Sequence, residues 1–418
     1  MIETNFKHTD IGPIPHDWEV MPLSKIGTFF RGHGIVRKDS NSGNISALRY
    51  GEIYTTHHNY VKEYVSHISR EVANDSFRLK IGDICFAGYG ETLQDIGKAV
   101  AITKEEEAYA GQNIVVLRPS KRISAIYFGY MLNMPNIAIQ KANRGNGSSI
   151  MLITPKALSE ILTPIPESED EQMRIGKALS DIDELIGGLR KLIEKKRNIK
   201  KGAMSRFLSG SLRLPGFNKP WETNLLGDLG IFIKGKGISR DESNSGSIPA
   251  IRYGEIYTYH SDYIKKFRSH ISQKVAETSQ SLKYGDICFA ASGETLDDIG
   301  KAVAFVDDFE AYAGGDIVIF RPQKEINPIF FGFLLNTPSV VLQKSLKGHG
   351  LSIMHIRAAS LAELVINYPT DIAEQEAIAK VLTDMDAEIE KLEKKLAKYE
   401  QVKQGMMKQL LTGKIRLI

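Results

Sequence analysis

The sequence predicts an α+β protein with two tandem globular domains related by a pseudo-two-fold axis, each followed by one long helix. Three observations support this fold class. Residues 12–214 return as residues 215–417 at a constant offset of 203, so that Trp18 corresponds to Trp221. Each copy begins with short apolar runs separated by Gly, Asn, Ser and Asp, which is typical of strands and turns. Each copy ends in a long heptad pattern, which predicts that the two helices pair as a coiled coil.

The globular part of each copy is predicted to contain strands and short helices. Strands are expected at GDICFA, KAVAI and NIVVLRP and at their second copies GDICFA, KAVAF and DIVIFRP. A helix is expected at AIYFGYMLNMPNIAIQKA and again at PIFFGFLLNTPSVVLQKS, divided at Pro135 and Pro338 because proline disrupts a helix interior. The predicted division is a first domain at 1–166, a central helix at 167–210, a second domain at 211–369 and a C-terminal helix at 370–418.

The long helices have clear start and stop signals. Ser168 with Glu171, and Asp371 with Glu374, stand at the spacing of a capping box, while Gly210 and Gly413 are expected to end the helices. A heptad pattern over about 38 residues favours a partner helix, although packing of each helix on its own globular domain is an alternative. The predicted seam residues are Ile175, Leu179, Ile182, Ile186, Leu189, Ile193, Ile378, Leu382, Met385, Ile389, Leu392 and Leu396.

Composition excludes several classes of protein. The chain of 418 residues is 42% hydrophobic and 25% charged, which is typical of a soluble globular protein. No apolar run approaches the ~18 residues that span a bilayer, and the start lacks the features of a signal peptide, so we expect a cytoplasmic protein without membrane contact. The two cysteines, Cys85 and Cys288, stand in the two GDICFA segments and are expected in buried strands. The net charge of +4 is mild, so a nucleic-acid surface would have to be local.

No catalytic or metal-binding constellation is found in the sequence. GETLQDIGKA has the wrong spacing for a phosphate loop, and residues such as His57 and His260 lack the spacing of metal ligands. No methyltransferase or nuclease motif is present. We therefore expect no catalytic residue, no metal site and no cofactor in this chain.

Glycine-rich loops with basic and aromatic residues are repeated in both copies and suggest contact with DNA. They include residues 30–43 with 233–246, and residues 143–149 with 346–352. Glycine permits close approach to phosphates, and Arg, Lys, Asn and His can contact phosphates or base edges. The alternative is that such loops only connect elements. The candidate DNA-contacting residues are Arg31, His33, Arg49, Tyr50, Tyr89, Lys98, Arg144 and Asn146 in the first copy, and Lys234, Lys236, Arg252, Tyr253, Ser292, Lys301, Lys347 and His349 in the second.

The candidates differ in expected role. Arg31, Arg49, Arg144 and their counterparts are expected at phosphates or guanine, the tyrosines at backbone or bases, and Asn146 and His349 at base edges. Residues 190–206 carry eight basic residues against one acid. This stretch is either a solvated helix face or a surface that faces DNA or an acidic partner.

The chain resembles the specificity subunit of type I restriction-modification enzymes over almost its whole length. The resemblance rests on WEVMPLSKIGTFFRG, the GDICFA and AGGDIVIFRP segments, PESEDEQMRIGKALSDID with PTDIAEQEAIAKVLTDMD, and the helix ends MSRFLSGSLRLPGF and MKQLLTGKIRLI. It implies two target-recognition domains that each read half of a bipartite site in double-stranded DNA, and two helices in an antiparallel coiled coil that sets their spacing.

The resemblance also implies partners. In that family the subunit is not itself catalytic and docks two methyltransferase subunits, which restriction-translocase subunits join. The complete assembly is a type I restriction endonuclease and adenine-N6 DNA methyltransferase, whose partner subunits use S-adenosylmethionine, ATP and Mg²⁺.

The near identity of the two copies adds a prediction of its own. We expect half-sites that are identical or nearly so, inverted, and separated by a non-specific spacer. Three other functions remain open: a stand-alone two-headed DNA-binding regulator, a recognition component cut from a fused restriction enzyme or an enzyme in its own right, and a purely structural coiled-coil scaffold.

Overall fold

A computed structural model describes residues 5–90, 92, 95–145, 151–293, 295, 298–348 and 354–418. Contacts between residues divide the chain into two compact units. Unit 1 consists of Met1–Arg190 and Lys394–Ile418, and unit 2 of Lys191–Glu393. Each unit therefore combines the globular part of one copy with helix segments from both copies.

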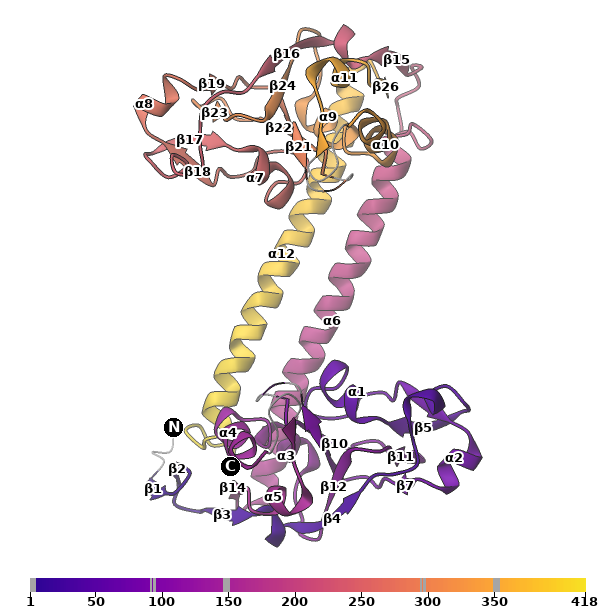
Figure 1. The fold of residues 1–418 in the computed structure, drawn as a ribbon, viewed down its shortest axis with the longest axis vertical. Helices are drawn as coiled ribbons and strands as arrows, with labels where there is room; N and C mark the ends of the chain where they lie inside the picture. Colours follow the sequence, from indigo (N-terminus) through magenta and orange to yellow (C-terminus); the bar gives the residue numbers. More distant parts are fainter. Residues whose placement is uncertain are drawn as a thin grey trace. The chain divides into compact units, whose positions relative to one another are not determined.

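Unit 1 is built from short strands and helices in an order that unit 2 largely repeats (Figure 1). Its elements are β1 (Phe6–Thr9), β2 (Gly12–Pro15), β3 (Trp18–Pro22), η1 (Leu23–Lys25), β4 (Gly27–Arg31), η2 (Arg37–Asp39), β5 (Ile45–Leu48), α1 (Tyr50–Thr55), β6 (Ser66–Ile68), α2 (Arg70–Asn74), β7 (Phe77–Arg78), β8 (Ile84–Ala87), β9 (Tyr89–Gly90), β10 (Ala99–Ala101), β11 (Ala108–Ala110), β12 (Ile114–Pro119), α3 (Ala125–Met131), α4 (Pro135–Arg144), β13 (Met151–Leu152), α5 (Pro155–Ser159), β14 (Leu162–Pro166) and the beginning of α6 (Glu169–Phe207).

Unit 2 repeats this order from the strand that follows the first long helix. Its elements are β15 (Glu222–Leu225), η3 (Leu226–Asp228), β16 (Gly230–Lys234), β17 (Ile248–Ile251), α7 (Tyr253–Thr258), β18 (Ser269–Ile271), α8 (Gln273–Ala276), β19 (Gln280–Ser281), β20 (Ile287–Ala290), β21 (Ser292–Gly293), β22 (Ala302–Ala304), β23 (Tyr312–Ala313), β24 (Ile317–Pro322), α9 (Pro328–Leu334), α10 (Pro338–Lys347), β25 (Met354–His355), α11 (Ala358–Ala362), β26 (Val365–Tyr368) and the beginning of α12 (Ile372–Leu410).

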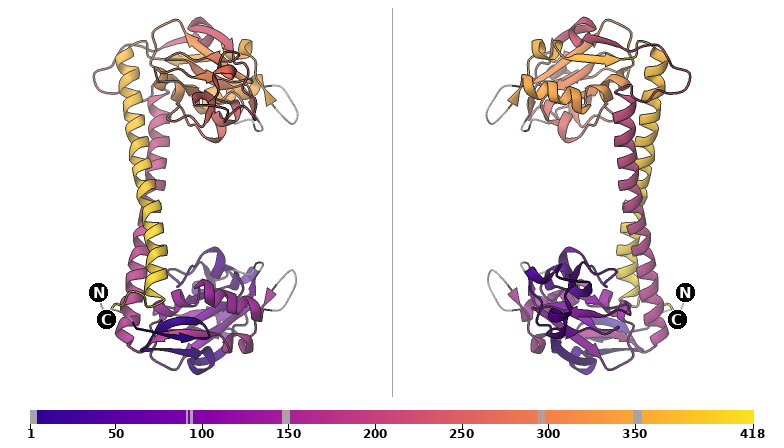
Figure 2. Two further views of the ribbon diagram at one scale, coloured as in Figure 1. Left: turned by 90° about the vertical axis from the view of Figure 1, so that its left-hand side faces the viewer. Right: turned by 90° about the vertical axis from the view of Figure 1, so that its right-hand side faces the viewer.

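Each unit contains two four-stranded sheets with the same strand order. In unit 1 the orders are β10-β8-β12-β4, which is antiparallel throughout, and β6-β5-β11-β7, in which β5 and β11 run parallel. The corresponding sheets of unit 2 are β22-β20-β24-β16 and β18-β17-β23-β19. Both views of Figure 2 show that the strands of each unit lie to one side of that unit's long-helix segments. The mixed α+β class and the repeated domains are as predicted.

The central strand of each first sheet is buried on both faces. Ile84 and Phe86 of β8 belong to the core that contains Tyr127 of α3, whereas the alternating residues Cys85 and Ala87 belong to a second core on the opposite face. Successive side chains of a strand point to opposite faces, which explains the uninterrupted apolar run. Both cysteines are free and buried, as expected from the sequence. The predicted division at proline is confirmed, since α4 begins at Pro135 and α10 at Pro338.

The residues predicted to begin and end the long helices lie at their ends, but the capping box is formed only in part. The carboxylates of Glu171 and Glu374 bind Arg416 and Arg213 instead of the backbone N–H at the start of their own helices. The Glu171 N–H donates to Ser168 Oγ at 3.3 Å at the start of α6. Gly210 and Gly413 have φ of 71° and 67° in the turns that follow α6 and α12. A left-handed φ favours glycine, which explains its use at both stops. No helix in the described residues is long and apolar enough to cross a membrane.

The two long helices run antiparallel within each unit. In unit 1, Asp183 and Arg190 of α6 pair with Lys403 and Glu400 of α12, so that partner numbers fall as numbers along α6 rise. In unit 2, Lys200 of α6 likewise pairs with Asp386 of α12 at 2.6 Å. Coiled-coil packing along the full helices stays a prediction.

The predicted seam requires a correction at its two ends. Ile175 and Leu179 lie in the same core as Trp18 and Tyr127, and Ile378 and Leu382 lie in the corresponding core of unit 2. The first two seam positions of each helix therefore pack in the core of a globular part, which agrees with the alternative that each helix packs on its own globular domain. The middle positions Ile182, Ile186, Leu189, Ile193 and Ile389 are also buried, whereas Met385, Leu392 and Leu396 are half-buried.

Candidate nucleic-acid interface

A cleft of about 390 Å³ opens in unit 1 where several strands end. We call it cleft 1. Its lining includes Arg31 at the end of β4, His33, Tyr89 of β9, Asn113 in the turn before β12, and the segment Leu152–Pro155. Strand pairing positions these groups, since Arg31 is opposite Val115 and Tyr89 is opposite Leu152.

The side chains of cleft 1 present hydrogen-bonding groups to solvent. Arg31, His33 and Asn113 are exposed, and His33 is held by Nδ1 at 3.0 Å from the carbonyl oxygen of Asp75. Asn113 has a φ of 67°, a backbone conformation that asparagine tolerates better than most residues. The ring of Tyr89 lies 6.3 Å from that of Tyr50, which is 37% exposed. Arg31, His33, Tyr50 and Tyr89 are thus brought together, as a DNA-contacting role requires.

Unit 2 has a cleft at the corresponding place, with a volume of about 380 Å³. We call it cleft 2. Its lining includes Lys234, Ser292, Asp316, His355 and Arg357. Ser292 is buried, and its Oγ lies 2.9 Å from Nδ1 of His355. Asp316 has a φ of 58° and occupies the turn position of Asn113.

The two clefts share a backbone arrangement and differ in chemistry. Seven lining positions change between the copies at the constant offset. Two of them, Gly88 to Ala291 and Pro155 to Ala358, involve no hydrogen-bonding side chain. The other five are Arg31 to Lys234, Tyr89 to Ser292, Asn113 to Asp316, Leu152 to His355, and Thr154 to Arg357. Asparagine can donate and accept, which suits adenine, whereas aspartate only accepts, which suits the amino group of cytosine. The pair of clefts can therefore read different hydrogen-bonding patterns from similar positions.

Both clefts carry an available positive charge. Within the described ranges, neither Arg31 nor Lys234 forms an ion pair, and both side chains are exposed. An unpaired cation at the rim of a cleft can contact a phosphate or a guanine.

Several other candidates are engaged in internal contacts. Arg49 Nε donates to Glu52 Oε1 at 3.1 Å and to Ser66 Oγ at 2.9 Å, and Glu52 also accepts a short bond from Ser66. Arg144 and Lys347 pair with Glu160 and Glu363, which occupy the same place in the two copies. These contacts favour structural roles over the DNA contacts expected from sequence.

The remaining candidates lie outside the clefts' lining. Lys301 Nζ donates to the carbonyl oxygen of His260 at 2.7 Å, and burial lowers the pKa of both Lys98 and Lys301. Tyr253 packs on the core of unit 2 beside Tyr257, Arg252 is the residue before α7, and Lys236 is exposed. Asn146 and His349 lie outside the described residues.

Larger hollows of about 710 and 650 Å³ lie beside the long helices, at corresponding places in unit 1 and unit 2. Their charged lining residues are largely satisfied by each other, as with Asp183 and Lys403 at 2.7 Å. We therefore place the candidate interface at the smaller clefts. The basic stretch 190–206 is also partly satisfied within the chain, because Lys196, Arg197 and Lys200 pair with acids of α12.

Sequence reasoning missed Asn113, Asp316, His355 and Arg357. The signal that could have found them is a change of residue type between the two copies. It occurs directly before β12 and at or just after β13, and at the corresponding positions of the second copy. No group of three or more metal-ligating side chains is found among the described residues.

Comparisons with known proteins agree with this architecture. The family described as type I restriction modification DNA specificity domain matches twice, at residues 15–195 and 218–401. A Methanocaldococcus jannaschii protein named for the specificity subunit of the type I restriction enzyme MjaX is 31% identical over 441 residues, covering 99% of this chain and 97% of the relative. The specificity subunit of MjaVIII from the same organism is 25% identical, with the same coverage.

Solved structures show the same fold. The S subunit of a type I restriction-modification system from M. genitalium has a TM-score of 0.61 at 14% identity, covering 94% of this chain and 96% of its own. A chain from a type I R-M system studied for complex assembly and conformational transition has a TM-score of 0.52 at 14% identity, covering 96% and 99%. With two family matches that together span most of its length, this chain belongs to the type I restriction-modification DNA specificity family.

Proposed function

We propose that this protein directs a type I restriction-modification complex to a bipartite DNA target, with cleft 1 reading one half-site and cleft 2 the other. The observation that carries the proposal is the pair of equivalent clefts, in which the backbone is repeated and the hydrogen-bonding groups differ. Sequence is read by hydrogen bonds to base edges, so residues that vary on a repeated scaffold are suited to that task.

The duplication supports a target with inverted and nearly identical half-sites. Two copies related by a pseudo-dyad would meet the two strands of DNA in the same way, as symmetric dimers do. The changes at five cleft positions support a difference of one or two base pairs between the half-sites.

The long helices are suited to setting the spacer. Each is continuous for 39 residues, which corresponds to ~58 Å at the rise of an α-helix. We further propose that they dock two methyltransferase subunits, which restriction-translocase subunits join. S-adenosylmethionine, ATP and Mg²⁺ would then be used by those partners, and this chain would contribute no catalytic group.

Methylation mapping by single-molecule sequencing tests the proposal in cells that carry the complete complex. The expected result is one bipartite motif with inverted, nearly identical half-sites around a non-specific spacer. Two unrelated half-sites would contradict the symmetry, and no new methylated motif would contradict the function. Copurification distinguishes a specificity subunit from a stand-alone regulator, because the former retains two methyltransferase chains and the latter retains none.

A further inference from the structure

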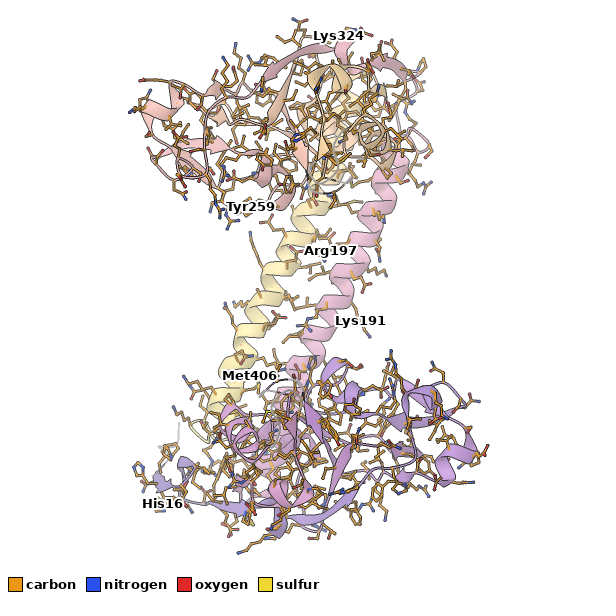
Figure 3. The ribbon with its side chains drawn as sticks, in the orientation of Figure 1. His16, Lys191, Arg197, Tyr259, Lys324 and Met406 are labelled. Atoms are coloured by element: carbon orange, nitrogen blue, oxygen red, sulfur yellow. The ribbon has the colours of Figure 1, made fainter. Side chains whose placement is uncertain are left out.

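Each unit joins α6 to α12 by an exposed ion pair at the same place, but the two pairs have opposite polarity. In unit 1, Arg190 of α6 contacts Glu400 of α12 at 2.6 Å. In unit 2, Arg197 of α6, labelled in Figure 3, contacts Glu393 of α12 at 2.5 Å. The offset of 203 makes Arg190 the counterpart of Glu393, and Arg197 the counterpart of Glu400. The first copy thus carries arginine at both positions, and the second carries glutamate at both.

This distribution discriminates between possible helix pairings. If α6 met α6 of a second chain in the same geometry, Arg190 would face Arg197. If α12 met α12, Glu393 would face Glu400. Charges at the flanks of paired helices set partner choice, and a like-charge contact opposes the wrong partner.

A second ion pair also distinguishes pairing of unlike helices from pairing of like helices. Lys196 of α6 pairs with Glu388 of α12 at 2.7 Å in unit 2. Their counterparts in the other copy are Tyr399 and Leu185, neither of which is charged. Pairing of like helices would therefore place each of these charges opposite an apolar or aromatic side chain.

A third ion pair is the same in both copies and cannot discriminate. Lys200 with Asp386 in unit 2 corresponds to Lys403 with Asp183 in unit 1. The side chains of these four residues are only 13–18% exposed, whereas those of the inverted pairs are 42–62% exposed. The common pairs would support any pairing, which leaves selectivity to the exposed, inverted pairs.

We propose that the inverted ion pairs select contact between unlike helices, α6 with α12, and oppose association of this chain with a second copy through like helices. Arg190 and Arg197 on one helix, and Glu393 and Glu400 on the other, form the selective surface. This property does not depend on the proposed reading of DNA.

Full-length variants with unchanged composition test the proposal. Exchanging Arg197→Glu with Glu400→Arg makes both contacts between α6 and α12 repulsive and both like-helix contacts attractive. We expect this variant to melt roughly 3 °C lower than the wild type at low salt, since exposed pairs are weak and a small stability change shifts the melting temperature by a few degrees. We also expect more dimer in sedimentation velocity, and both effects should fade in 1 M NaCl because salt screens exposed charges.

Two matched variants isolate selectivity from simple loss of an ion pair. The fourfold variant Arg190→Glu, Arg197→Glu, Glu393→Arg and Glu400→Arg restores opposite charges at both places and should match the wild type. The neutral variant Arg197→Gln with Glu400→Gln should lie between the wild type and the exchanged variant. The proposal is overturned if the exchanged variant has the melting temperature and sedimentation of the wild type. It is also overturned if the exchanged variant melts no lower and forms no more dimer than the neutral variant, or if the fourfold variant does not regain the melting temperature of the wild type.

Discussion

At the scale of single residues, two arginines expected to contact DNA have different surroundings. Arg31 is exposed at the rim of cleft 1, whereas Arg49 is 29% exposed and held by Glu52 and Ser66. Arg31 is the last residue of β4 and Arg49 directly follows β5, so their positions in the local pattern could not separate them. The deciding partner, Ser66, lies 17 residues away from Arg49 along the chain.

Alanine substitutions at these two positions should affect different quantities, stability for Arg49 and DNA binding for Arg31. Arg49→Ala leaves the carboxylate of Glu52, which is 4% exposed, without its cation and should lower the free energy of unfolding by about 1–3 kcal/mol. Arg31→Ala should leave stability unchanged and weaken binding of the assembled complex to its target by about 1–3 kcal/mol if it contacts guanine. Thermal unfolding and DNA titration of both variants check this. Loss of stability in Arg31→Ala, or a purely binding defect in Arg49→Ala, would reverse the assignment.

A buried lysine of unit 1, Lys141, should make stability depend on pH. Lys141 Nζ donates to the carbonyl oxygens of Gly97 and Leu132 at 2.7 and 2.9 Å, and burial lowers its pKa to about 7. The unfolded chain has the ordinary lysine pKa of about 10.4, so between pH 7 and 10.4 only the unfolded state binds the proton. Stability contributed by this site therefore rises with pH across that window and is constant below it.

Lys141→Met removes this titration. The stability of the wild type relative to the variant should increase from pH 7 to pH 9 by at most about 1.4 kcal/mol per pH unit. Denaturant unfolding at several pH values measures it. Lys156→Met is the control, because it removes an exposed lysine of α5 and leaves the buried Lys141 in place. A difference for Lys141→Met that does not change with pH would show that this lysine is not neutral in the folded protein.

At the scale of elements, the long helices, the proline-divided helices and the central strands could be predicted. Short helices such as α1 and α5, and the packing of the long-helix ends, could not. Heptads and caps specified α6 and α12, and proline placed the starts of α4 and α10. A heptad pattern shows which residues are apolar and not what covers them. In unit 1 the covering residues at the end of α12 are Leu410 and Leu411, which pack with Trp18 from the opposite end of the sequence.

An arginine after each long helix anchors this packing. Arg416 donates from Nε and Nη2 to the carboxylate of Glu171 at 2.5 and 2.8 Å, and Glu171 is 1% exposed. In unit 2, Arg213 holds Glu374 in the same way. Because removal of one partner leaves a buried charge, Arg416→Ala should lower the stability of unit 1 by about 3 kcal/mol.

Hydrogen exchange measures the effect and locates it. Protection should fall in β3 and β14 for Arg416→Ala, and in β15 and β26 for the matched variant Arg213→Ala. Arg174→Ala is the control, since Arg174 is exposed and makes a long hydrogen bond of 3.4 Å to the carbonyl oxygen of Leu417. Equal loss of protection in both units from either variant would show that the anchors do not act locally.

At the scale of the whole molecule, the duplication allowed the repeated fold to be predicted, but only some residues of the clefts. The apolar runs are shared by both copies, and they determined the sheets. The cleft residues are brought together by pairing of β9 with β13 and of β4 with β12, which are distant in sequence. Neither spacing nor composition indicates that Asn113 shares a cleft with Arg31.

Because the two clefts stand on the same scaffold, one should be convertible into the other. Five substitutions would give cleft 2 the side chains of cleft 1 at every shared lining position where a hydrogen-bonding side chain differs: Lys234→Arg, Ser292→Tyr, Asp316→Asn, His355→Leu and Arg357→Thr. If these positions account for the difference between the half-sites, the methylated motif should become a perfect inverted repeat of the half-site read by cleft 1. The spacer should keep its length, because α6 and α12 are unchanged.

Methylation mapping of this variant would decide whether the clefts read bases. Tyr284→Ile is the control, because the copies also differ there, at an exposed position outside cleft 2, and its motif should be that of the wild type. A motif in which only the second half-site changes would identify cleft 2 as its reader. An unchanged motif from a folded and active variant would place base reading elsewhere in unit 2, since substitution of the hydrogen-bonding groups that read a base costs about 1–3 kcal/mol of discrimination.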